Sequence, residues 1–288
     1  MGMSFTWNRN HEIAYGSKNN KVLYFKDPDG YARRELVAKL SYTYRQGIYN
    51  TASLEGRYFN GFVEDTIGKL TNDYFFGNRI NMEFFSMKMF LRRDCRDSKA
   101  YPLKGYYLDG DVMKIGLRIL ADEQVDLWNL TASARKYLKL SERFFLAGSL
   151  RGKISSRTDQ PYYTQRGLGY SDYVRGYVYY VVDGQKYALA KFGAKYMIIK
   201  PHVKKLDMIR SDKFNTFHYA LYTEIFADGG YDDDCLYGES VNPLANEYLY
   251  GYGIGINYVT YYDAVLRIEY SFNKAGEHGL FIHLGAPI

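Results

Sequence analysis

The sequence predicts an all-β protein, a transmembrane antiparallel β-barrel of about 12 strands with a long outer loop folded into its lumen. Many runs alternate apolar and polar residues with a period of two, and they are longer than ordinary soluble strands. Aromatic residues make up 18% of the chain, although its mean hydropathy is only −0.40. Short and long connections also alternate along the chain, as they do in outer-membrane barrels.

The strands are expected in the following order. A short first strand lies within 4–15, and a loop rich in Asn, Asp and Gly follows at 16–34. The next runs, 36–45 and 51–58, are joined by a very short connection and form a hairpin. A second long connection, 60–78, has room for a helical turn near its start. The later strands are expected at 81–92, 113–119, 128–135, 144–151, 188–196, 217–228, 248–258, 262–271 and 279–288.

A soluble β-sandwich or soluble barrel is the alternative, because its strands also alternate. The long runs, the Lys and Arg in mid-strand and the tyrosines on apolar faces favour the membrane barrel. No domain linker is present, so we expect a single domain over 1–288. With both chain ends in the periplasm, the long connections at 16–34, 60–78, 156–184 and 231–245 face outside.

Composition excludes several other classes of protein. No window approaches 18 continuous apolar residues, so a transmembrane helix is excluded. The net charge is +6, but Lys and Arg are dispersed, which argues against a nucleic-acid partner. Cys95 and Cys235 are too few for a disulfide framework or a metal cluster. The start lacks a basic and apolar signal region, so we expect a mature chain without its leader.

A resemblance to a known family rests on the stretch Val174-Arg175-Gly176-Tyr177 and its surroundings. Gly169-Tyr170 precedes this stretch and Val182-Asp183-Gly184-Gln185 follows it. Together they resemble the sixth outer loop of the BamA superfamily, which includes barrel-assembly proteins and two-partner-secretion transporters. Three later segments look like the family's strands, and the resemblance covers roughly the C-terminal half. These segments are Phe226-Ala227-Asp228-Gly229-Gly230, Tyr250-Gly251-Tyr252-Gly253-Ile254-Gly255 and Gly279-Leu280-Phe281-Ile282-His283-Leu284.

The chain also departs from the family's pattern. Family members have more strands than this chain has room for, and they carry periplasmic POTRA modules. No POTRA-like pattern occurs here, so the chain looks like a reduced branch without a POTRA domain, and its N-terminal half fits the bacteroidete branch loosely. Gly193 stands where the strand after the loop usually has an acid, and Ile288 stands where the last residue is usually aromatic.

The lumen loop motif, Val174 to Tyr177, is expected to dock on the barrel wall. A buried Arg175 needs charged partners, and either Asp228 or Glu224 on one polar strand face can accept its hydrogen bonds. The resemblance points to Asp228, and Glu224 is the candidate replacement for the acid missing at Gly193. The next strand has glycines on its lumen face, and their lack of side chains would let the loop main chain approach; they are Gly251, Gly253 and Gly255. Gly176 is expected to allow a tight main-chain conformation in the loop itself. The alternative is a solvated Arg175, with the glycines relieving sheet curvature.

No catalytic residue, cofactor or metal site is expected. The histidines lack ligand spacing, no serine sits in a nucleophile elbow, and the glycines at 251–255 are not followed by a helix. By strand parity the lumen is expected to be net positive, which favours anionic solutes or lipid head groups, or else holds the acidic partner groups of the plug loop. The expected cations are Lys39, Arg45, Arg57, Lys88, Lys114, Arg118, Arg135, Arg151, Lys191, Lys195 and Arg267, against Glu55, Glu224, Asp228, Asp263 and Glu269.

Two classes of function follow for a protein of the bacterial outer membrane. The last run carries Gly285 and Pro287, so its pairing with a short first strand is expected to be weak; the alternative is an ordinary barrel end that frays near Pro287. The resemblance then implies a protein that assists insertion or translocation of proteins through this seam. Its partners would be outer-membrane lipid and a separate periplasmic protein or an unfolded client. The alternatives are a passive small pore or structural barrel with a retained plug loop, and lipid handling.

Overall fold

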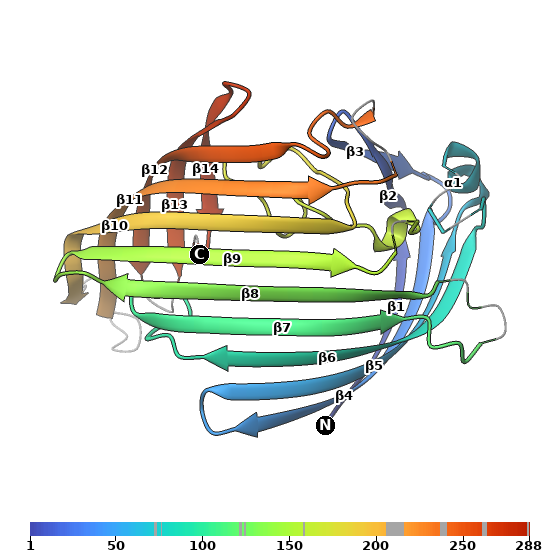
Figure 1. The fold of residues 1–288 in the computed structure, drawn as a ribbon, viewed down its shortest axis with the longest axis horizontal. Coiled ribbons are helices and arrows are strands. Elements are labelled where there is room, and N and C mark those ends of the chain that lie inside the picture. Colours follow the sequence, from blue (N-terminus) through green and yellow to red (C-terminus); the bar gives the residue numbers. More distant parts are fainter. Residues whose placement is uncertain are drawn as a thin grey trace.

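Twelve strands form one curved antiparallel sheet, and two more form a small hairpin beside it (Figure 1). This computed structural model describes the chain except 72, 73, 76, 121, 122, 124, 158, 206–215, 237–240, 261–263 and 287, and the side chains of 216 and 217. In sheet order the strands are β1 (Gly2–Asn10), β4 (Arg33–Gln46), β5 (Asn50–Val63), β6 (Asn81–Asp94), β7 (Gly105–Ile115), β8 (Leu127–Lys139), β9 (Phe144–Ser155), β10 (Lys186–Lys205), β11 (Thr216–Asp233), β12 (Tyr248–Thr260), β13 (Val265–Asn273) and β14 (His278–Leu284).

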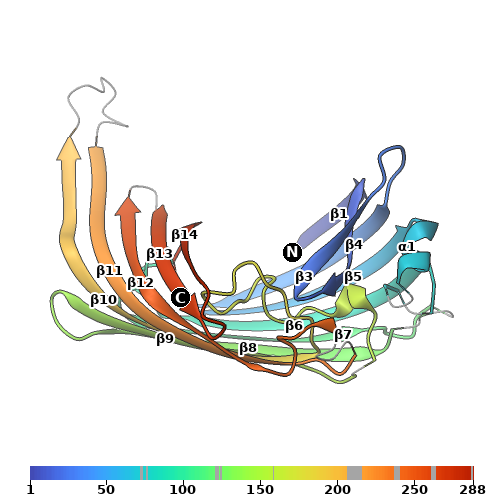
Figure 2. The ribbon, with the colours of Figure 1, turned by 90° about the horizontal axis from the view of Figure 1, so that it is seen from above.

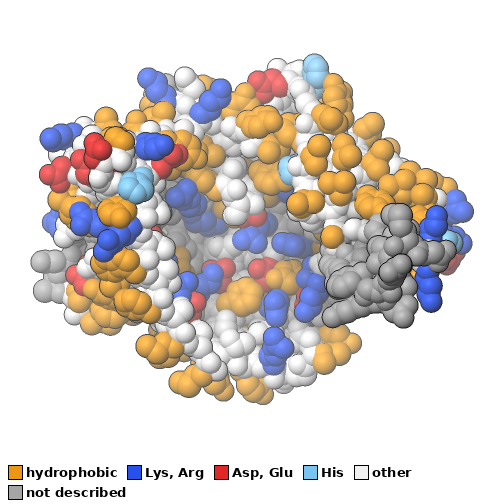
Figure 3. Space-filling model, turned by 180° about the vertical axis from the view of Figure 1, so that it is seen from behind, with side chains coloured by type: hydrophobic (Ala, Val, Ile, Leu, Met, Phe, Trp, Pro, Cys, Tyr) orange, Lys and Arg blue, Asp and Glu red, His pale blue; other side chains and the backbone are white. Residues whose placement is uncertain are grey.

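The two faces of the sheet differ in the way that the alternating sequence predicts. In β12, Tyr250, Tyr252 and Ile254 are half exposed on the convex face, while Gly251 and Gly253 between them are buried on the concave face. Figure 3 shows Lys and Arg gathered in the hollow, with hydrophobic side chains over the flanks. The prediction of an all-β fold of about twelve antiparallel strands is confirmed. No helix among the described residues is long and apolar enough to cross a membrane.

Residues 12–26 form a hairpin of β2 (Glu12–Lys18) and β3 (Lys21–Lys26), although they were expected to be the end of the first strand and the start of the loop at 16–34. Asn19 and Asn20 turn the chain with φ of 52° and 57°. Asparagine tolerates this left-handed conformation, and two such residues make the tight turn that suits a hairpin. The connection at 60–78 contains a single helical turn, α1 (Asp65–Leu70), as expected.

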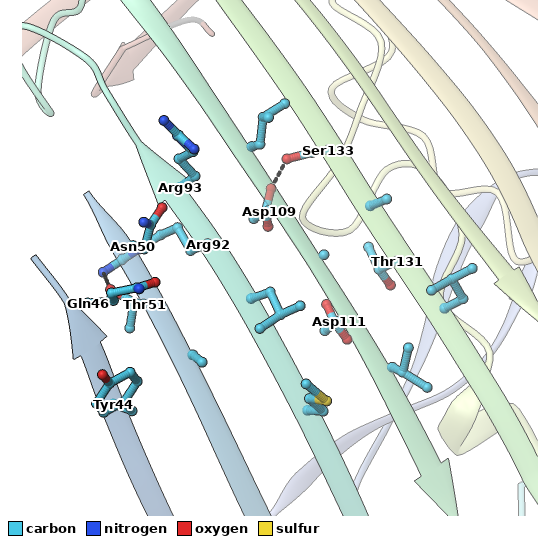
Figure 4. A pocket seen from close by; sticks show the side chains of 18 residues that line it. Tyr44, Gln46, Asn50, Thr51, Arg92, Arg93, Asp109, Asp111, Thr131 and Ser133 are labelled. Atoms are coloured by element: carbon cyan, nitrogen blue, oxygen red, sulfur yellow. Dashed lines mark hydrogen bonds between the residues drawn. The ribbon is translucent and has the colours of Figure 1, made fainter.

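The prediction of a strand at 113–119 is wrong, because β7 spans Gly105–Ile115. Gly116 and Arg118 end it, with φ of 80° and 58°. The shift also reverses the expected facing of this strand. Lys114 lies on the convex face, 5.4 Å from the centre of the Trp128 ring, so Lys114 and the exposed Arg118 do not line the lumen. Two acids of β7 face the concave side instead, and Figure 4 shows Asp109 hydrogen-bonded to Ser133 of β8, with Asp111 further along β7.

The sheet ends in two free edges. β1 pairs with β4 and β14 pairs with β13, but no pairing joins β1 to β14 among the described residues. Figure 2 shows a trough, with the C-terminal strands rising on one side and the N-terminal strands on the other. Residues 2–9 of β1 are exposed, so this strand lacks cover on both of its faces.

The trough is filled by the connection from β9 to β10, residues 156–185, which we call the lumen loop (Figure 2). The loop begins with a 3₁₀ turn at Tyr162–Thr164, and Tyr162 packs in the apolar cluster under β4–β8. Farther along, Val174 and Tyr177 join a second cluster with Leu189 of β10 and Leu249 of β12. The loop thus contacts both walls of the trough.

Candidate functional site

The centre of the candidate site is Arg175, which is only 1% exposed in the lumen loop. Its Nε and Nη2 donate to the two carboxylate oxygens of Asp228 at 2.8 and 2.6 Å, and its main-chain N–H donates to the same carboxylate at 3.1 Å. Two parallel bonds from a guanidinium to a carboxylate are a strong and directional arrangement. The structure therefore brings together Arg175 and the partner that the resemblance indicated.

Two further carboxylates share the other side of the guanidinium. Arg175 Nη1 lies 3.3 Å from Glu224 Oε1 and 3.4 Å from Glu269 Oε1. Glu224 was a sequence candidate, and its carboxylate occupies the space beside Gly193 that a side chain there would fill. Glu269 was placed on the lumen wall from the sequence, but not beside Arg175. Its second partner, Arg267, lies 3.0 Å away and adds a positive charge to the cluster.

The guanidinium also rests on an aromatic ring. The Arg175 Cζ lies 3.8 Å from the centre of the Phe226 ring, and Nη2 donates to the Phe192 carbonyl at 3.2 Å. A cation over a ring face in a buried site gains electrostatic energy in addition to its ion pairs. Phe226 belongs to a segment that resembles a family strand, but no contact with Arg175 was predicted for it. Its position two residues before Asp228, on the same strand face, was the available signal.

Each of the three glycines of β12 makes room for a different part of this cluster. A side chain at Gly251 would collide with the Arg175 carbonyl, and one at Gly253 would reach the Phe226 ring at 2.8 Å. Gly255 pairs with Glu224 on one side and with Glu269 on the other, so both carboxylates can lean over it. The glycines therefore do more than relieve curvature, because their missing side chains leave space for Arg175 and for the side chains that contact it.

The neighbours of Arg175 hold the loop main chain in place. Gly176 has φ of 94°, and its carbonyl accepts a bond from Asn273 Nδ2 at 3.1 Å. A side chain at this position would also press on the main chain of β13. Val174 and Tyr177 are buried, and the Tyr177 hydroxyl accepts a bond from the Lys274 N–H at 3.2 Å. The four-residue motif thus combines one charged contact with apolar and main-chain contacts.

Buried polar side chains connect this cluster to the other end of the sheet. Asn257 Nδ2 donates to Glu224 Oε2 at 2.8 Å and to the Tyr101 hydroxyl at 3.0 Å. Tyr101 belongs to the connection between β6 and β7, residues 95–104, and Lys195 Nζ lies 4.5 Å from the centre of its ring. The contacts Arg175–Glu224–Asn257–Tyr101 therefore run along the trough, and we call them the polar chain.

A second group of contacts fixes the end of the lumen loop. The hydroxyls of Ser17 in β2 and Tyr170 in the loop both donate to Asp183, which is fully buried. Burial raises the pKa of Asp183, while these two hydrogen bonds act in the opposite direction. Nearby, Asp232 accepts a bond from the Leu168 N–H at 2.8 Å. The β2–β3 hairpin thus packs on the loop, a contact that sequence reasoning missed along with the hairpin.

The C-terminal residues, expected to form part of the seam, turn away from β14. Gly285 has φ of 119°, and its N–H donates to the Val265 carbonyl at 2.8 Å. Pro287 lies outside the described residues. The Ile288 carbonyl accepts a bond from the Tyr137 hydroxyl of β8 at 2.9 Å, so the chain end crosses the trough. In the described part of the chain, no group of three or more His, Cys, Asp or Glu side chains could hold a metal ion.

Comparisons with known proteins agree with this architecture. No curated protein sequence matches the chain. A solved structure, that of BamA from Haemophilus ducreyi lacking POTRA domains 1–3, is similar with a TM-score of 0.60 at 11% identity, which shows the fold alone. The match covers 88% of this chain and 54% of the BamA chain, so this chain spans about half the length of that BamA chain. The Omp85 superfamily domain matches residues 2–279, and the chain therefore belongs to the Omp85 superfamily of outer-membrane β-barrels.

Proposed function

We propose that this protein assists the insertion or translocation of other proteins at the free edges of β1 and β14. The observation that carries the proposal is that neither edge has a pairing partner among the described residues. An unpaired edge offers a row of main-chain donors and acceptors to an incoming strand. The partners would be outer-membrane lipid, an unfolded client and a separate periplasmic protein, and the chain itself is proposed to have no enzymatic activity.

The docked lumen loop supports this proposal. Its cluster around Arg175 ties together β10, β11 and β13, which stiffens the C-terminal wall next to β14. In the part of the chain that the structure describes, the hydrogen bonds of β1 tie it to one neighbouring strand, β4. A stiff wall facing a loosely held edge strand is the arrangement that local opening at the edge requires.

A passive pore is the second candidate, and the basic hollow in Figure 3 favours it. Several observations count against a wide aqueous path. The lumen loop fills the trough at one end, and Tyr101 and Ile288 cross it toward the other. Lipid handling is a third candidate, supported by the large convex apolar face.

Cross-linking tests the edge directly. Cys95 and Cys235 are first replaced by serine, and a cysteine is placed at Thr6 in β1. Thr131 in β8 is the matched control, since both threonines lie on the concave face and only β8 has a neighbour on each side. An unfolded outer-membrane client with a cysteine in its last strand is then presented. We expect a disulfide adduct with Thr6→Cys and little or none with Thr131→Cys.

Two outcomes would count against insertion at this edge. Equal cross-linking at both positions would mean that the client meets the whole concave face. Large, steady conductance in planar bilayers, with no effect on client insertion in liposomes, would favour the passive pore. Arg175→Ala is measured alongside in both assays, because loss of the docked loop should raise conductance in a pore.

A further inference from the structure

The wall opposite the Arg175 cluster contains a separate cavity of about 350 Å³. It lies between the start of the lumen loop and the concave face of β4–β8. Arg33 of β4, Arg57 of β5 and Arg166 of the loop line it, together with one acid, Glu35. Three guanidinium groups against one carboxylate make this cavity net positive.

The arginines of this cavity are incompletely paired. Arg33 Nη1 lies 3.5 Å from Glu35 Oε1, whereas no carboxylate of the described residues lies within ion-pair distance of Arg57 or Arg166. Arg57 Nη2 donates to the Tyr163 hydroxyl at 3.3 Å. The Nε atoms of Arg33 and Arg57 are both buried and find no hydrogen-bond acceptor in the described part of the chain. Buried N–H groups without acceptors are uncommon in proteins, and an anion or an ordered water bound between them would satisfy them.

The remaining lining is suited to an oxyanion. Ser86 pairs with Arg57 across β5 and β6, it also lines the cavity, and it is 4% exposed. Tyr163 and Arg166 approach from the loop side. Arg166 also stacks on the Tyr170 ring at 4.5 Å, which holds its side chain without neutralising its charge.

We propose that this cavity binds a phosphate group, through Arg33 and Arg57 on the wall and Arg166 on the lumen loop. Guanidinium forks match the geometry of phosphate oxygens and bind them through paired hydrogen bonds. The bound group would join the loop to β4, the strand that pairs with the free edge strand β1. Two sources carry this chemistry, free inorganic phosphate and the phosphorylated head group of a membrane lipid. The inference is independent of insertion activity, since it depends on the cavity alone.

Calorimetry on the purified full chain in an uncharged detergent tests the site. Inorganic phosphate is titrated in one arm and a short-chain phosphatidic acid in the other. We expect binding in at least one arm, weakened about tenfold or more by Arg57→Gln, because a hydrogen-bonded charge is lost. Arg34→Gln is the matched control. Arg34 follows Arg33 in β4 but lies on the opposite, convex face, where its Cζ is 4.7 Å from the centre of the Phe62 ring. This variant should bind as the unmodified chain does.

The two arms distinguish the sources. Tight phosphatidic acid binding with weak phosphate binding assigns the site to a lipid head group, and the reverse order assigns it to the free anion. Arg166→Gln repeats the test with an exposed loop residue, so that misfolding of a wall variant cannot hide the result. Absence of binding in both arms, or equal binding by the Arg57, Arg166 and Arg34 variants, would overturn the proposal.

Discussion

At the scale of single residues, Arg175 has more charged partners than one positive charge can neutralise. One buried guanidinium meets three carboxylates, an aromatic ring and a main-chain carbonyl. Arg267 offsets part of the excess negative charge through Glu269. Removing Arg175 would therefore leave buried carboxylates facing each other, which costs more than the loss of the hydrogen bonds.

Arg175→Ala should lower the free energy of unfolding by about 3–5 kcal/mol, the usual cost of breaking a buried ion pair. Arg175→Lys should be intermediate, because an ammonium keeps the charge but cannot bond both Asp228 oxygens as a fork. Urea unfolding in detergent micelles, followed by tryptophan fluorescence, measures both. Arg157→Ala is the control in the same loop, since its pair with Asp159 is exposed and worth about 0–1 kcal/mol. Equal losses for the Arg175 and Arg157 alanine variants would contradict the docking of the loop.

Asp183 makes stability depend on pH. Its pKa is raised in the folded chain, chiefly because burial disfavours the carboxylate. The stability that it contributes is therefore complete below its unfolded pKa of about 3.9 and is lost as pH rises through the folded value. Relative to Asp183→Asn, the unmodified chain should lose melting temperature as pH rises from about 4 toward neutrality.

Asp159 provides a control of opposite sign. The Arg157 guanidinium lowers the pKa of Asp159, so Asp159→Asn should cost a little stability at neutral pH and less in acid. Melting temperatures of both variants across this range check the pair. A constant difference between the unmodified chain and Asp183→Asn would show that the Asp183 carboxyl is not buried in solution.

At the scale of elements, the sequence predicts strands well where the two faces differ in kind. β12 is the clearest example, because tyrosines and isoleucines alternate with glycines over its length. β7 was misplaced because Asp109, Gly110 and Asp111 weaken its first half, while the alternation continues past Gly116, where the chain turns. The β2–β3 hairpin was missed because its strands are short and its Asn19-Asn20 turn lacks glycine.

The candidate site was accessible to the sequence only in part. Period-two alternation tells which face a side chain occupies, but it does not tell which residues of neighbouring strands lie opposite each other. Glu269 meets Arg175 because the register aligns Lys195, Glu224, Gly255 and Glu269 in one row across four strands. That register follows from tertiary pairing. The family resemblance supplied Asp228, and local pattern alone would have left Arg175 as a solvated loop residue.

At the scale of the whole molecule, the polar chain joins segments that enter the trough from opposite ends. Arg175 comes from the lumen loop, and Tyr101 comes from the connection between β6 and β7. Glu224 and Asn257 stand between them, and all four side chains are at most 5% exposed. Since buried hydrogen-bonded groups strengthen one another, a change at one end should be felt at the other.

Tyr101→Phe tests this coupling, because it removes one hydroxyl and keeps the packing of the ring. Asn257 then loses a hydrogen-bond partner. The interaction between Glu224 and Arg175 should weaken by about 0.5–1.5 kcal/mol, the net contribution of one hydrogen bond. Hydrogen exchange at residues 174–177 should accelerate by roughly two- to tenfold. Tyr248→Phe is the control, since Tyr248 lies on the same strand as Asn257 but is 73% exposed. Faster exchange confined to residues 95–104 would mean that this connection and the lumen loop open independently, and the polar chain would then not couple them.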